Sequence, residues 1–204
     1  ASSQEEFINI FGANASNIIG HILNKEESRI QRSYGAQLND GVLKGLKEKW
    51  GLKMTIPKGY NLVSQTEDFS WIRYETKDIS QNLLIYSVPY TEANTFSSEG
   101  MVTVVNELCK MAVPGPDNET FMSLYNDYPP QFDEVSVAGQ YATKLTGLWT
   151  VEGALMGGPY MCYAFLDATE KRVYYLQGFV FSPGKKKRNY VRQVDAILRS
   201  AQLL

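Results

Sequence analysis

The strongest constraint on the fold is a change of hydrophobic period that occurs twice along the chain. From about residue 52, apolar and polar side chains alternate in short runs, which is typical of strands. Over residues 97–112 the period lengthens to three or four, as in an amphipathic helix, and the same change recurs from 132–181 to 186–203. The order strands, helix, strands, helix predicts an α+β fold, a mainly antiparallel sheet covered by helices on one face or on both.

Proline, glycine or polar residues separate the expected strands. The first group comprises residues 52–56, 61–66, 69–75 and 82–88. The second group comprises residues 132–137, 141–152, 161–167 and 172–181. Because residues 82–88 are too apolar for an exposed edge, we expect them at the centre of the sheet. The turn-rich stretch 114–131 predicts a mobile connection between the two groups.

The amino-terminal residues 1–51 predict a helical segment packed on the sheet domain of residues 52–204, the two forming one compact unit. Apolar side chains recur at helical spacing from 4 to 31, although two glycines weaken this pattern. A second helix is expected from about Asn39 to Trp50. Asp40 is the expected N-cap and Gly51 the expected left-handed stop.

Composition excludes several classes of function. The formal net charge of -2 gives no long-range field toward nucleic acid or an anionic membrane. No stretch approaches the roughly 20 apolar residues that span a bilayer. The first residues lack the basic start and apolar region of a signal peptide, so the chain is either cytosolic or a mature or trimmed form.

The side chains that most often carry chemistry are scarce or unsupported. His21 is the only histidine, so neither a Ser-His-Asp triad nor a histidine-rich metal site is expected. No glycine-rich phosphate loop is present, and the basic run 185–188 is expected to be a solvated loop and first helical turn. Carboxylates are plentiful, but their spacing identifies no acid–base pair. We therefore expect no catalytic residue, no metal and no cofactor.

Two cysteines are present. Cys109 lies on the apolar stripe of the helix at 97–112, and Cys162 lies in an expected strand. We expect two buried free thiols, since free cysteine behaves as a small hydrophobe. A disulfide would require the helix to pack over that strand. A catalytic thiol is disfavoured because no histidine is available to activate it.

The most unusual local stretch is Met156–Tyr160, in which Gly157 and Gly158 precede a proline. Adjacent glycines permit a positive φ angle or the close approach of another backbone. One interpretation is a tight connection between strands. The other is a loop that receives a ligand or partner beside Trp149 and Tyr160.

Seven stretches, in order, resemble an uncharacterised Bacteroidetes family of lipoproteins known as a domain of unknown function. They are Phe69–Arg73, Ile85–Tyr90, Pro114–Pro116, Gly147–Trp149, Met156–Tyr160, Gly178–Pro183 and Lys187–Gln193. The resemblance implies export and attachment to the cell envelope, in the periplasm or at the outer membrane, through a lipidated cysteine upstream of this chain. It implies no activity. The order of elements is also similar to the fold of the PsbP and Mog1 proteins, which says nothing of function.

We therefore expect a non-enzymatic cell-envelope domain that binds a protein, glycan or lipid partner, and no nucleic acid. Large aromatic side chains are good anchors for such binding. The expected binding residues are Arg73, Tyr90, Trp149, Met156, Gly157, Gly158 and Tyr160. Two alternatives stay open: a carboxylate-dependent glycan hydrolase, and a structural domain that supports a further amino-terminal segment.

Overall fold

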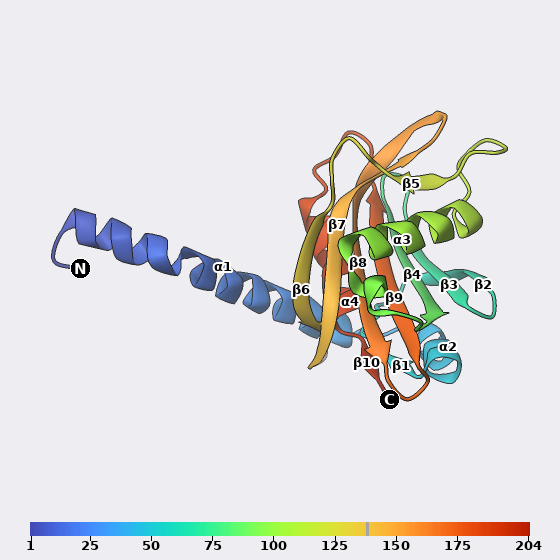
Figure 1. The fold of residues 1–204 in the computed structure, drawn as a ribbon, viewed down its shortest axis with the longest axis horizontal. Helices are drawn as coiled ribbons and strands as arrows, with labels where there is room; N and C mark the ends of the chain where they lie inside the picture. The colour runs from blue at the N-terminus through green and yellow to red at the C-terminus, as the bar shows by residue number, and fades with distance from the viewer. Residues whose placement is uncertain (138) are drawn as a thin grey trace.

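A curled antiparallel sheet of eight strands dominates the computed structural model, which describes residues 1–137 and 139–204 (Figure 1). Its strands are β2 (Asn61–Gln65), β3 (Phe69–Glu75), β4 (Ser80–Pro89), β5 (Met122–Leu124), β6 (Gln131–Val137), β7 (Gln140–Val151), β8 (Ala154–Asp167) and β9 (Arg172–Phe181). The order is β2-β3-β4-β9-β8-β7-β5, and β6 also pairs with β7. The α+β class with an antiparallel sheet is thus confirmed.

Helices cover both faces of this sheet. The helices are α1 (Gln4–Gly35), α2 (Asp40–Trp50), α3 (Ser98–Ala112) and α4 (Arg188–Arg199), with a short 3-10 helix η1 (Ala93–Phe96). Figure 1 shows α3 lying across one face and α4 behind the sheet. A small second sheet joins β1 (Leu52–Lys53) to β10 (Gln202–Leu203).

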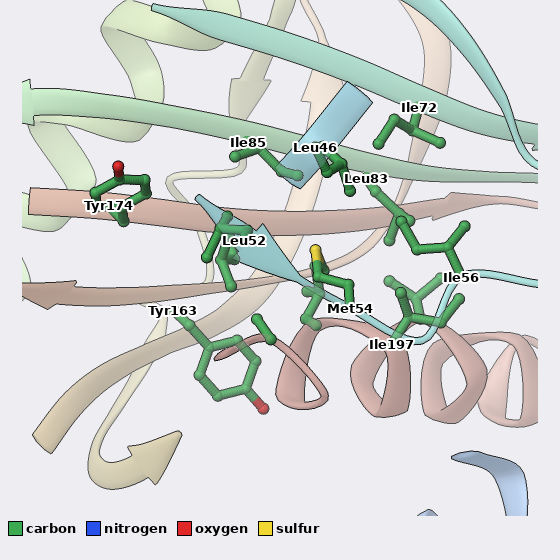
Figure 2. Packing of buried hydrophobic residues seen from close by; sticks show 14 of the residues in the cluster. Leu46, Leu52, Met54, Ile56, Ile72, Leu83, Ile85, Tyr163, Tyr174 and Ile197 are labelled. Carbon is green, nitrogen blue, oxygen red and sulfur yellow. The ribbon is translucent and has the colours of Figure 1, made fainter. Parts of the chain in front are cut away.

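The alternation along each strand divides the interior into two cores. On β4, Leu83 and Ile85 join the core beneath α2 and α4. Figure 2 shows this core, where Leu46 of α2 and Ile197 of α4 meet the sheet residues. The intervening side chains of β4, including Leu84, join a second core with the apolar stripe of α3. A central strand buried on both faces explains why Leu83, Leu84, Ile85 and Tyr86 follow one another without a polar residue between them.

The amino-terminal segment packs only in part on the sheet domain. Helix α2 places Leu46 and Trp50 in the core, whereas most of α1 extends away from the body (Figure 1). The prediction that residues 1–51 pack as a whole is therefore wrong for residues 4–24. The physical reason is that α2 and α4 already cover that face, so α1 docks on α4 through its last turns alone. There Ile30 is buried and Gln31 Nε2 donates to the Ala196 carbonyl over 2.9 Å.

Several element ends differ from the predicted ones for local reasons. Asn39, not Asp40, caps α2, because the Asn39 side chain accepts from the Val42 N–H. Gly51 ends this helix at φ 59°, as predicted. Helix α4 stops at Arg199, before the expected 203, because the chain then turns into β10. The Met156–Tyr160 stretch lies inside β8, so the prediction of a connection or loop there is wrong.

Both cysteines are buried free thiols, as predicted. They border a polar network in the core beneath α3. Tyr86 donates its hydroxyl to Gln177 Oε1 over 3.1 Å, and Gln177 Nε2 lies 3.4 Å from Cys109 Sγ. Cys162 Sγ lies 3.9 Å from the Tyr86 hydroxyl oxygen. The network thus gives the buried amide of Gln177 partners at both of its ends.

The buried Cys109 thiol makes stability depend on alkaline pH. Burial raises the pKa of this thiol from 9.0 to about 11. The folded state holds the Cys109 proton more tightly than the unfolded state does, so the protonated thiol stabilises the fold. This stabilisation is complete below about pH 9 and is lost as pH rises toward 11. Between about pH 9 and 11 the free energy of unfolding, measured with urea, should fall by up to ~1.4 kcal/mol per pH unit. Cys109→Ala should show a shallower decline over this range, and identical declines in the two proteins would contradict the assignment.

Candidate functional site

A pocket of about 300 Å³ opens on the face of the sheet that carries α3, beyond the carboxyl end of that helix. Strands β3, β4, β9, β8, β7 and β5 provide its floor, and the chain that follows α3 provides a wall. The lining residues are Trp71, Arg73, Glu75, Ser80, Asn82, Val113, Pro114, Gly115, Pro116, Met122, Trp149, Val151, Met156, Phe179 and Phe181. This is the part of the face that α3 leaves uncovered.

The floor of the pocket is aromatic. Trp149 meets Phe179 edge to face with ring centroids 5.3 Å apart, and the Phe181 ring lies 6.1 Å from Trp149. The Trp149 indole Nε1 donates to the Val180 carbonyl over 3.3 Å. Only 3% of Trp149 is exposed, so one side of the ring belongs to the core while its edge borders the pocket.

Two glycines in β8 make room for this indole. Gly157 and Gly158 pair with Thr150 and Trp149 of β7. A Cβ atom on Gly158 would overlap the Val180 carbonyl oxygen and lie 3.0 Å from Trp149 Nε1. The glycines are therefore required by the close approach of neighbouring groups and not by a turn, because neither has a positive φ angle.

Polar groups line one edge of the pocket and satisfy one another. Arg73 makes an ion pair with Glu75 over 3.0 Å, and its guanidinium carbon lies 5.7 Å from the centre of the Trp71 ring. The Trp71 indole Nε1 donates to Asn82 Oδ1 over 2.9 Å. Asn82 in turn donates to Ser80 Oγ over 3.0 Å. The alternation of β3 places its three lining residues on the same face.

The opposite wall is a loop closed on itself by backbone hydrogen bonds. Gly115 donates its N–H to the Thr120 carbonyl over 2.8 Å, and Met122 donates to Val113 over 3.0 Å. A Cβ atom on Gly115 would lie 2.7 Å from Val151 Cγ1. The start of the stretch predicted as a mobile connection is thus fitted against β7.

The expected binding residues are only partly brought together. Arg73, Trp149 and Met156 line the pocket, and the glycine pair lies beside it. Tyr160 is 2% exposed and does not line the pocket, so its ring is not presented to a ligand there. The side chains of Tyr160 and Trp149 both belong to the core that α3 joins, and the edge of Trp149 also borders the pocket.

Tyr90 lies away from the pocket. It follows the end of β4, and its ring centroid lies 6.1 Å from that of Phe96 in η1. Sequence reasoning missed Trp71 and Phe179, although Trp71 alternates with Arg73 on an expected strand. The sequence predicts the residue at which α3 ends but not where that end lies over the sheet, and this position decides which part of the sheet face stays open.

Acidic side chains are sparse in the pocket. Among the described lining residues Glu75 is the one carboxylate, whereas a glycosidase needs two facing acids. Burial raises the pKa of the Glu27 carboxyl, but this residue lies at the α1–α4 contact and pairs with Arg199 over 3.0 Å. Within the described ranges, no group of three or more His, Cys, Asp or Glu side chains is placed to hold a metal ion. In the same ranges no helix has the length and apolar character needed to cross a membrane.

Comparison with solved structures finds remote likenesses. A point mutant of protein Mog1 and the Saccharomyces cerevisiae Ran-binding protein Mog1p each give a TM-score of 0.45 at 10% identity, covering 75% of this chain and 90% of theirs. The likeness to Mog1 expected from the order of elements is thus found. The human StarD13 (DLC2) lipid transfer and protein localization domain gives 0.35 at 16% identity, covering 82% of this chain and 100% of that one. Likenesses at this level say nothing of ligand or activity.

Two comparisons of the sequence, one with curated proteins and one with protein families, gave different outcomes. No curated protein matches the chain. Residues 39–200 match a protein family, and this match includes every strand of the large sheet together with α3 and α4. The chain therefore belongs to the family described as Domain of unknown function (DUF4837).

Proposed function

We propose that this domain is a non-enzymatic binding module that holds an apolar group of its partner in the pocket beside Trp149. The observation that supports the proposal is the division of the pocket surface. Aromatic and methionine side chains form the floor, and the charged pair of Arg73 and Glu75 stands at one edge. Ligand sites commonly combine an apolar interior with a few polar groups that fix orientation.

The partner that fits best is a protein segment that inserts one large apolar side chain. A volume of about 300 Å³ is at the small end of ligand pockets, which favours a single side chain over a long acyl chain. A sugar would need several free polar groups, yet Trp71, Asn82 and Arg73 already bond to neighbours. The Arg73–Glu75 pair would meet the polar backbone beside the inserted side chain.

We also propose that the protein is exported and works in the cell envelope of Bacteroidetes as a lipoprotein. The support is the resemblance of the seven sequence stretches. Membrane attachment would come through a lipid anchor upstream of this chain. Protease treatment of intact cells and of spheroplasts tests the location, and protection in both would contradict export.

The pocket is tested with the fluorescent probe 1-anilinonaphthalene-8-sulfonate. Two of the three tryptophans, Trp71 and Trp149, line the pocket, so their emission should change on titration. Met156→Asp places a negative charge among apolar side chains, where it also repels the sulfonate of the probe, and should weaken probe binding at least about tenfold. Leu155→Asp is the matched control, because this neighbour is fully exposed and does not line the pocket. Equal binding by both variants would place the probe elsewhere.

The class of partner is tested by displacement of the bound probe. Short peptides with one Phe, Met or Leu should displace the probe, and replacing that residue by Ser should abolish the effect. A fatty acid and an oligosaccharide serve as the other arms. Displacement by either of these, with no displacement by peptides, would contradict a protein partner.

A further inference from the structure

The first part of α1 presents large apolar side chains to solvent over more than four helical turns. Each is between 39% and 59% exposed. They are Phe7, Ile8, Ile10, Phe11, Ile18, Ile19, Ile22 and Leu23. Figure 1 shows this part of the helix standing clear of the sheet. A contiguous apolar surface of this kind marks an interaction site.

Most of these side chains form one stripe with the spacing of a coiled-coil seam. At about 100° per residue, most of them fall on one face of the helix. Within that face Ile8, Phe11, Ala15, Ile18 and Ile22 repeat at intervals of three, four, three and four. This is the heptad spacing with which one helix packs against another. The contact with α4 is made by a later part of the helix, around Ile30 and Gln31.

The composition of this part of α1 gives the helix little stability of its own. Between Phe7 and Asn24 the chain holds no Asp, Glu, Lys or Arg, so ion pairs between successive turns cannot support the helix. Gly12, Gly20 and four asparagines in this stretch have low helix propensity. A helical segment of such composition draws its stability mainly from packing of its apolar face against a partner.

We infer that the partner is a second copy of this chain, and that two α1 helices pack stripe to stripe. Identical stripes without charged residues can face each other without repulsion. The six of these side chains that lie on the seam face present on the order of 100 Å² each, or roughly 600 Å² per chain and about 1,200 Å² for the pair, which reaches the lower end of a standard stable interface. Ala15 lies at the middle of the seam, where its small side chain lets the two backbones approach.

The inference does not depend on the proposed function. The stripe lies on α1, whereas the pocket lies on the face of the sheet that carries α3, so failure of one leaves the other standing. A segment preceding this chain is the competing occupant of the stripe. If two copies pack together, the 204-residue chain by itself has twice the mass of a monomer. If a preceding segment covers the stripe instead, this chain by itself has the mass of a monomer.

The mass in solution tests the dimer. Sedimentation of the full chain at micromolar concentration should give twice the 23.0 kDa of one chain. Phe11→Glu with Ile18→Glu places two charges on the seam and should give a monomer. Asn9→Glu with Asn17→Glu adds the same charges on the opposite face and should stay dimeric. A 23.0 kDa wild type, or a seam variant that keeps the dimeric mass, would overturn the inference.

Cross-linking tests the same interface without relying on a variant that loses its helix. Ala15→Cys should form a disulfide-linked dimer under mild oxidation, since the seam brings the two copies of this position together. Ala13→Cys lies on the opposite face and should stay monomeric under the same conditions. The two native cysteines are buried and do not interfere. Equal cross-linking at both positions would overturn the inference.

Discussion

Gly158→Ala is expected to destabilise the domain by ~3 kcal/mol or more, a cost at the upper end for overpacking in a well-packed interior. The added Cβ would overlap the Val180 carbonyl oxygen, which belongs to backbone and cannot rotate away. It would also press on the indole of Trp149 at 3.0 Å. Urea unfolding followed by circular dichroism measures the loss as a lower midpoint at unchanged slope.

A second glycine provides a control of opposite sign. Gly45 lies in α2 with no atom within 4 Å of an added Cβ and without a positive φ angle. Gly45→Ala should therefore stabilise the protein by ~0.5–1 kcal/mol through helix propensity. Equal and small effects at Gly158 and Gly45 would show that β8 does not lie against β9 as described.

Trp149→Ala is expected to cost ~3–5 kcal/mol, the range for truncating a large buried aromatic side chain. The indole is 3% exposed, contacts Phe179 and Phe181, and fills the space left by Gly158. Its loss should also enlarge the pocket and change probe binding. Thermal unfolding monitored by circular dichroism measures the loss of stability, and titration with the probe measures the change in binding.

Trp149→Phe is the matched control for the ring itself. It keeps an aromatic side chain beside Phe179 but removes the hydrogen bond to the Val180 carbonyl. Its cost should be clearly smaller than that of Trp149→Ala, because most of the burial is retained. Loss of probe binding by Trp149→Ala with no loss of stability would show instead that the residue acts as an exposed anchor.

The fold was largely predictable because local patterns and tertiary structure agree. The alternation at 69–75 and 172–181 gives β3 and β9 with the predicted ends, and the stripe at 97–112 gives α3. The apolar run at 82–88 gives a central strand buried on both faces. The end of β8 at Asp167 agrees with the prediction, but its start was missed, since the two glycines suggested a turn while the strand continues through them.

The candidate site was less predictable than the fold. Arg73, Trp149 and Met156 were expected together and do share a pocket, but Tyr90 does not join them and Tyr160 lies in the core. Large aromatic side chains serve equally as core and as surface anchors. Which role each one takes depends on coverage by other parts of the chain, and the spacing of one residue along its own strand contains no such information.

The sequence alone determined the period of each segment, and with it the two strand groups, their trailing helices and the burial of both thiols. Tertiary structure alone decided that α3 leaves part of the sheet face open and that α1 extends away from the body. The physical reason is the separation along the chain of the residues that decide each feature. Periodicity arises from side chains within a few turns of one another, whereas coverage depends on contacts between residues far apart in the chain.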